Sequence, residues 1–158
     1  MAYLRSLRIS SINEDEFLQL KSLSSPPSLL QNLRLHGRLS TLHDWIFNLE
    51  NLVRVGLQWT RISYHSYKIL GALPKLLYPY LYKGYDGGEL HLEEGHFQQL
   101  KYLGLLALNG LNRLMLPDEG PDRWKVKHIP NVELYCRSRG ARYDRYKLSD
   151  SRLSNALL

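Results

Sequence analysis

The chain has 158 residues, of which 44% are apolar and 23% charged, so it is long enough for one folded domain and too balanced in composition to be disordered. Its net charge of +6 favours acidic partners without naming their class. A single cysteine, Cys136, excludes an internal disulfide framework and argues against a structural zinc site. The first residues, from Met1 to Arg5, lack the apolar run of a secretory signal, and no apolar stretch approaches the ~20 residues of a membrane helix. We therefore expect a cytoplasmic protein without membrane insertion.

Leucine accounts for 34 of the residues and recurs with a fixed period. A six-residue pattern with apolar first, fourth and sixth positions, here called the hexad, occurs five times: Leu4-Leu7-Ile9, Leu30-Leu33-Leu35, Leu52-Val55-Leu57, Leu76-Pro79-Leu81 and Leu100-Leu103-Leu105. Successive hexads begin 26, 22, 24 and 24 residues apart. These spacings lie within the range of about 20 to 29 residues that is typical of leucine-rich repeats.

The hexads predict an α/β fold: a leucine-rich-repeat solenoid of about five repeats, with a curved parallel β-sheet and an irregular or helical convex side. Each hexad would be a short strand whose apolar positions point into the core. A helical bundle is the alternative, because amphipathic helices also place apolar residues three and four apart. Breaker residues such as Pro26-Pro27 and Gly87-Gly88 recur between the hexads and disfavour long helices.

The segments between the hexads give three local expectations. Asn13, followed by three acidic residues, predicts the cap of a short helix that runs to Leu20. The apolar residues from Leu42 to Leu49 continue the inward pattern, and the other convex segments are expected to be irregular. Pro79 occupies an inward strand position without an N–H donor, so we expect the fourth strand to be short or bent.

The pattern stops at residue 116, which divides the chain into leucine-rich repeats at 1–116 and a capping, basic tail at 117–158. Apolar residues on both sides of Gly140 predict a hairpin between Asn131 and Tyr146, which would cap the open end of the stack. The tail carries five basic residues: Arg137, Arg139, Arg142, Arg145 and Lys147.

Several motifs go beyond a generic repeat. They are Leu42-His43-Asp44-Trp45-Ile46, Tyr85-Asp86-Gly87-Gly88-Glu89-Leu90 and Trp124-Lys125-Val126-Lys127-His128-Ile129-Pro130. Together they resemble the C-terminal leucine-rich repeats of plant intracellular nucleotide-binding disease-resistance proteins of the coiled-coil class. The resemblance implies a sensor and autoinhibitory region in plant defence. Its partners would be the nucleotide-binding module of the same receptor, a pathogen effector or a guarded host protein.

The chain departs from that family in three respects. It lacks the phosphate loop and the coiled coil, so we do not expect it to bind ATP in the family's way. Leu116 and Trp124 are almost contiguous where the family has further repeats, which implies a deletion, a splice form or a gene fragment. Met1 comes directly before the first strand, which would leave an open sheet edge. A truncated receptor fragment without signalling function is therefore the alternative.

Counted from the first residue of each hexad, the second, third, fifth and seventh positions alternate away from the core and would line the concave face. We predict a protein-binding site there: Arg8, Arg34, His36, Arg54, Gln58, Tyr78, Tyr80, Tyr82 and Tyr102. Arg8, Arg34 and Arg54 would stack about 5 Å apart on neighbouring strands, and their mutual repulsion would favour an acidic partner. A merely solvated polar face is the alternative.

Neither an enzyme nor a cofactor site is expected. His91 and His96 are five residues apart, and Gly95 disfavours the helix that a zinc protease would need. Cys136 has no evident histidine partner, and no group of nucleophile, acid and base is visible. Tyrosines alternate with the arginines of the tail, so an anionic ligand such as nucleic acid or phospholipid is a further alternative, although we do not expect nucleic acid.

Overall fold

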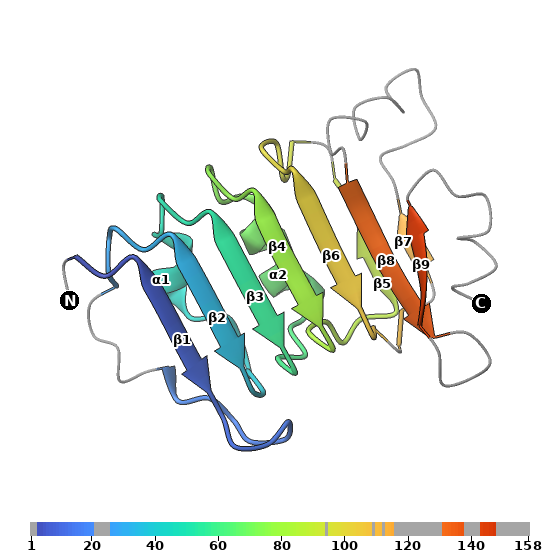
Figure 1. Cartoon of the computed structure of the whole chain (residues 1–158), viewed down its shortest axis with the longest axis horizontal. Coiled ribbons are helices and arrows are strands. Elements are labelled where there is room, and N and C mark those ends of the chain that lie inside the picture. Colours follow the sequence, from blue (N-terminus) through green and yellow to red (C-terminus); the bar gives the residue numbers. More distant parts are fainter. Residues whose placement is uncertain are drawn as a thin grey trace.

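The computed structural model describes residues 3–20, 26–93, 95–108, 110–111, 113–115, 131–137 and 143–147, with the backbone alone for 114–115, 131–137 and 143–147. It is an α/β fold whose main sheet has seven strands in the order β1-β2-β3-β4-β6-β8-β9 (Figure 1). The strands are β1 Ser6–Ser10, β2 Asn32–His36, β3 Arg54–Gln58, β4 Tyr78–Tyr82, β6 Tyr102–Leu106, β8 Asn131–Arg137 and β9 Tyr143–Lys147. A second, two-stranded parallel sheet pairs β5 (Glu89–His91) with β7 (Arg113–Met115). The helices are α1 (Asp44–Phe47) and α2 (Tyr64–Gly71).

Five strands of the main sheet lie where the hexads predict them. β1, β2, β3, β4 and β6 are parallel, and each begins at the third position of its hexad. The register pairs Ser6 with Asn32, Asn32 with Arg54 and Arg54 with Tyr78, which is the alignment of the hexads. A parallel sheet of this kind excludes the helical-bundle alternative.

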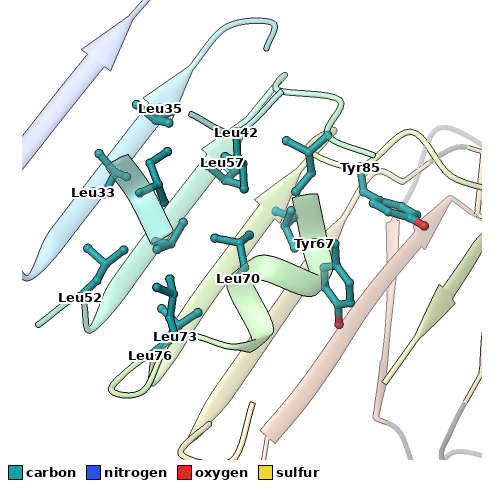
Figure 2. Packing of buried hydrophobic residues seen from close by; sticks show 14 of the residues in the cluster. Leu33, Leu35, Leu42, Leu52, Leu57, Tyr67, Leu70, Leu73, Leu76 and Tyr85 are labelled. Carbon is teal, nitrogen blue, oxygen red and sulfur yellow. The ribbon is translucent and has the colours of Figure 1, made fainter. Parts of the chain in front are cut away.

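The inward positions of the hexads form the core. Leu33, Leu35 and Leu57 are at most 1% exposed, and Figure 2 shows them within the buried cluster. The corresponding residues of β1, Leu7 and Ile9, are only half-buried, because β1 is an edge strand with a neighbour on one side only. α1 and α2 lie behind the main sheet in Figure 1, so neither helix covers the opposite face, which we call the helix-free face of the described residues.

The helix expected after Asn13 does not form. The Asn13 Oδ1 accepts hydrogen bonds from the backbone N–H groups of Asp15 (3.2 Å) and Glu16 (3.1 Å), which makes a capped turn but no helix. Phe17 then forms a parallel β-bridge with Arg38. The segment is extended because its backbone pairs with the next turn of the chain, an interaction that local propensity does not reveal.

Helix α2 occupies a segment for which an irregular conformation was expected. The Ser63 hydroxyl caps it by accepting from the N–H of Ser66 (3.4 Å), and the helix buries Tyr67 and Leu70. α1 is a single turn that buries Trp45 and Ile46, in line with the inward pattern predicted there. Neither helix is long and apolar enough to cross a membrane, within the part of the chain that the structure describes.

Strand β4 is not shortened by Pro79. It has five residues, like its neighbours, and pairs with β3 over its full length. The N–H of Tyr78 donates to the carbonyl oxygen of Val53 on the β3 side (3.1 Å), so the nitrogen of Pro79 faces β6. The missing donor shortens only that second ladder, which comprises the three residues from Tyr80 to Tyr82.

The C-terminal strands form the hairpin expected between Asn131 and Tyr146. β8 and β9 pair antiparallel, and β8 extends the main sheet by pairing parallel with β6, with Tyr102 opposite Asn131. The turn expected at Arg139-Gly140 lies outside the described residues. The division of the chain at residue 116 stays a prediction.

The residue after each of the four inner hexad strands has a positive φ. These residues are Gly37, Trp59, Lys83 and Ala107. Three of their N–H groups donate to the next strand, for example Trp59 to the carbonyl oxygen of Tyr82 (2.9 Å). This left-handed corner extends the ladder by one residue, although three of the four residues are not glycine, the residue that adopts this conformation most easily.

Candidate protein-binding groove

A groove of about 360 Å³ lies across the helix-free face of the main sheet. Eight of the nine residues predicted for the protein-binding site line it: Arg8, Arg34, His36, Arg54, Gln58, Tyr78, Tyr80 and Tyr102. The remaining lining residues are Asn32, Leu33, Val55 and Gly56. Tyr82 lies on β4 but does not line the groove. The alternation of the hexads therefore brings eight of the nine residues to one groove, and their role in binding stays a prediction.

The basic end of the groove contains an arginine pair, Arg8 and Arg34. They are exposed and in direct register on β1 and β2, so their Cα atoms are about 5 Å apart. The expectation that Arg54 extends this row is wrong. Gly56 is the residue of β3 opposite Arg34, whereas Arg54 is opposite Tyr78 and places its guanidinium carbon 4.9 Å from the centre of that ring.

The described residues leave the charge at this end uncompensated. None of the groove-lining residues is an aspartate or glutamate, and Arg8, Arg34 and Arg54 form no ion pair with the described residues. Burial, reinforced by the charges of Arg8 and Arg34, lowers the pKa of His36 below its ordinary value of 6.5. His36 is therefore neutral at pH 7, and the arginines alone supply the positive potential that an anion would meet.

The other end is aromatic and rests on a glycine that the sequence analysis did not use. A Cβ at Gly104 would lie 2.7 Å from Cδ2 of Tyr80 and 2.8 Å from Cε1 of Tyr102, so both rings lie over the glycine. We call this arrangement the tyrosine platform. Both tyrosines are half-buried. A glycine at an outward strand position, flanked by tyrosines on two strands, is the sequence signal that could have revealed the platform.

The basic tail is described only in part. Arg137 lies on β8, and Arg145 and Lys147 lie on β9, each with its backbone alone described. Arg139 and Arg142 lie outside the described residues. The structure therefore places Arg137, Arg145 and Lys147 on the two strands at the end of the sheet away from β1, and the role of the tail in binding stays a prediction.

The histidine pair considered for zinc does not lie on a helix. His91 is in β5, and its Nε2 is 3.5 Å from Oε2 of Glu89, while His96 places Nδ1 3.4 Å from Oε2 of Glu93. Among the described residues, no three or more His, Cys, Asp or Glu side chains come together in a way that could hold a metal ion. Cys136 lies on β8, where only the backbone is described.

Comparison with known proteins identifies two relatives. The chain is 30% identical over 115 residues to the disease resistance protein RPM1 of Arabidopsis thaliana, an alignment that covers 73% of this chain and 12% of that protein. It is 32% identical over 73 residues to the disease resistance protein PIK6-NP of Oryza sativa subsp. japonica, covering 46% of this chain and 7% of that protein. No protein-family model and no solved structure matches. The resemblance seen in the motifs is thereby confirmed: the chain is related to a region of plant nucleotide-binding leucine-rich-repeat disease resistance proteins.

Proposed function

We propose that the chain is a leucine-rich-repeat solenoid of about five repeats that binds other proteins in plant defence. It would act in the cytoplasm as the sensor and autoinhibitory region of an immune receptor, without a cofactor and without catalysis. The similarity to two plant disease resistance proteins supports the defence role. The parallel strands at hexad spacing support the repeat architecture, because stacked repeats of 20 to 29 residues build such a sheet.

The observation that carries the proposal is the uncompensated groove. Arg8, Arg34 and Arg54 are exposed on a face that neither α1 nor α2 covers, and none of the lining residues neutralises them. Like charges on neighbouring strands repel, and an acidic partner surface removes that repulsion while the tyrosines supply contact area. The partner would be the nucleotide-binding module of a resistance protein, a pathogen effector or a guarded host protein.

A binding experiment with charge reversal tests the proposal. Nucleotide-binding modules encoded in the same genome are titrated with the purified chain, and then with a variant carrying Arg8→Glu, Arg34→Glu and Arg54→Glu. All three side chains are exposed, so the variant should fold, and binding of the cognate module should fall by at least tenfold because opposed charges become like charges.

The matched control reverses three exposed basic residues outside the groove: Lys75, Lys101 and Arg113. It changes the net charge equally and should leave binding within twofold. Equal weakening of binding in both variants would mean that only overall charge matters. If no nucleotide-binding module binds either the unchanged chain or the control variant, the autoinhibitory role is refuted. Thermal melts followed by circular dichroism, together with light scattering, check that the unchanged chain and both variants are monomeric and melt cooperatively.

A further inference from the structure

Two subsites face the same side of the sheet at a defined separation. The arginine pair lies between β1 and β2, and the tyrosine platform lies between β4 and β6. With β3 between β2 and β4, the centres of the two subsites are three strand spacings apart. At about 4.8 Å per spacing, that separation is about 14 Å.

An extended peptide that crosses the strands matches this separation with four residues. Such a peptide rises about 3.3 Å per residue and turns every second side chain to the same side, so side chains i and i+4 face the sheet about 13 Å apart. Side chain i+2 then faces β3. The residue of β3 in register with Arg34 is Gly56, which has no side chain and leaves room for a small residue of the peptide.

The chemistry of the two subsites determines which residues of the peptide suit positions i and i+4. The two guanidinium groups of the arginine pair have no carboxylate partner among the described residues, and a carboxylate between them accepts charge-assisted hydrogen bonds from both. The rings of Tyr80 and Tyr102 offer a half-buried aromatic surface, on which an aromatic side chain stacks favourably. Arg54, held over Tyr78, lies between the two ends.

We propose that the groove binds an extended peptide segment with an acidic residue and an aromatic residue four positions apart and a small residue midway between them. The juxtaposition of the arginine pair, the bare position at Gly56 and the tyrosine platform carries this proposal. It rests on the proposed function, since it assumes that the groove is a protein-binding site, and it adds the kind of segment that the partner must present.

NMR titration of the isotope-labelled full chain with short capped peptides tests the spacing. The probe is Ser-Glu-Ser-Gly-Ser-Phe-Ser, used together with the same sequence reversed, because the direction of the bound segment is not specified by the subsites. The control Ser-Glu-Ser-Gly-Phe-Ser-Ser has the same composition, but its aromatic residue is one position nearer and turns to the opposite side. The better of the two probes should bind at least fivefold more tightly than this control, and at least tenfold more tightly than its own variant with Gln in place of Glu.

Two single substitutions locate the site. Arg34→Gln should weaken the probe at least tenfold, whereas Arg113→Gln removes the same charge outside the groove and should leave the affinity within twofold. Equal affinities for probe and spacing control, or an Arg34→Gln variant that binds as tightly as the unchanged chain, would overturn the proposal. If the nucleotide-binding module binds in a manner sensitive to charge reversal but neither probe binds, the peptide motif is wrong and the proposed function stands. If neither the module nor the probes bind, the peptide motif and the autoinhibitory role are both wrong.

Discussion

Replacing Gly37 with alanine is the sharpest test of the left-handed corners that follow the strands. Gly37 has a φ of +131°, a conformation that side chains disfavour. A Cβ there would also lie 2.3 Å from Oγ of Ser11 and 3.0 Å from Cγ of Leu18. The Ser11 hydroxyl donates towards the carbonyl oxygens of Asn13 (2.7 Å) and His36 (3.0 Å), so its displacement breaks the link between two turns of the chain.

The expected loss of unfolding free energy has three parts. The backbone conformation costs an alanine about 1–3 kcal/mol. Loss of the Ser11 hydrogen bond, counted once because a hydroxyl has one proton, costs about 1 kcal/mol. Alanine also restricts the unfolded chain, which returns about 0.4–1 kcal/mol. These parts sum to about 1–4 kcal/mol, and we expect Gly37→Ala to lower the unfolding free energy by that amount, measured by urea denaturation followed by circular dichroism.

Two other glycines separate the backbone part from the steric part. Gly95 also has a positive φ (+81°), but a Cβ there meets no atom within 4 Å, so Gly95→Ala should cost only about 1–2 kcal/mol. Gly56 has no positive φ, and its Cβ would lie 3.5 Å from Cγ of Arg34, an ordinary contact, so only the restriction of the unfolded chain remains and Gly56→Ala should raise the unfolding free energy by about 0.4–1 kcal/mol. Equal losses at Gly37 and Gly95 would refute the contact with Ser11, and an unchanged Gly37→Ala variant would refute the corner itself.

Three further predictions concern single side chains. Thr60→Val removes a buried hydroxyl that donates to a backbone carbonyl oxygen at 3.0 Å and should lower the unfolding free energy by about 1 kcal/mol in the same urea assay; no loss would contradict that bond. Burial and the neighbouring arginines lower the pKa of His36, so protonation of His36 opposes folding, and the unfolding free energy should decline as the pH falls below 6.5. The variant Arg34→Gln should raise the pKa of His36 in an NMR titration. An unchanged pKa would mean that the guanidinium of Arg34 does not lie near His36. A hydrogen bond from Lys83 and its charge lower the pKa of Glu14, so this pair stabilises the fold above pH 4.5 and ceases to do so in more acidic solution. The variant Lys83→Met should bring the pKa of Glu14 back towards 4.5. A pKa of Glu14 that stays low in this variant would show that the pair does not form.

Periodicity alone determined where the sheet and its two faces lie. The hexads predicted five parallel strands, their register and their buried leucines such as Leu33 and Leu57. They could do so because successive side chains of a strand point to opposite faces, and the face that packs on the core must be apolar. The same alternation placed Arg8 and Arg34 side by side. Apolar residues around Gly140 likewise predicted the β8–β9 hairpin.

Only the tertiary structure decided the features that depend on contacts between distant residues. The acidic segment after Asn13 forms a turn, and Glu14 reaches Lys83 from 69 residues away (2.9 Å). Gly104 brings the rings of Tyr80 and Tyr102 together from two different strands. The left-handed conformations at Trp59 and Lys83 cannot be predicted from the local sequence, because the hydrogen bond to the next strand imposes them. Local periodicity could therefore predict which residues face the groove, but the shape and chemistry of its two ends arise from how the strands meet.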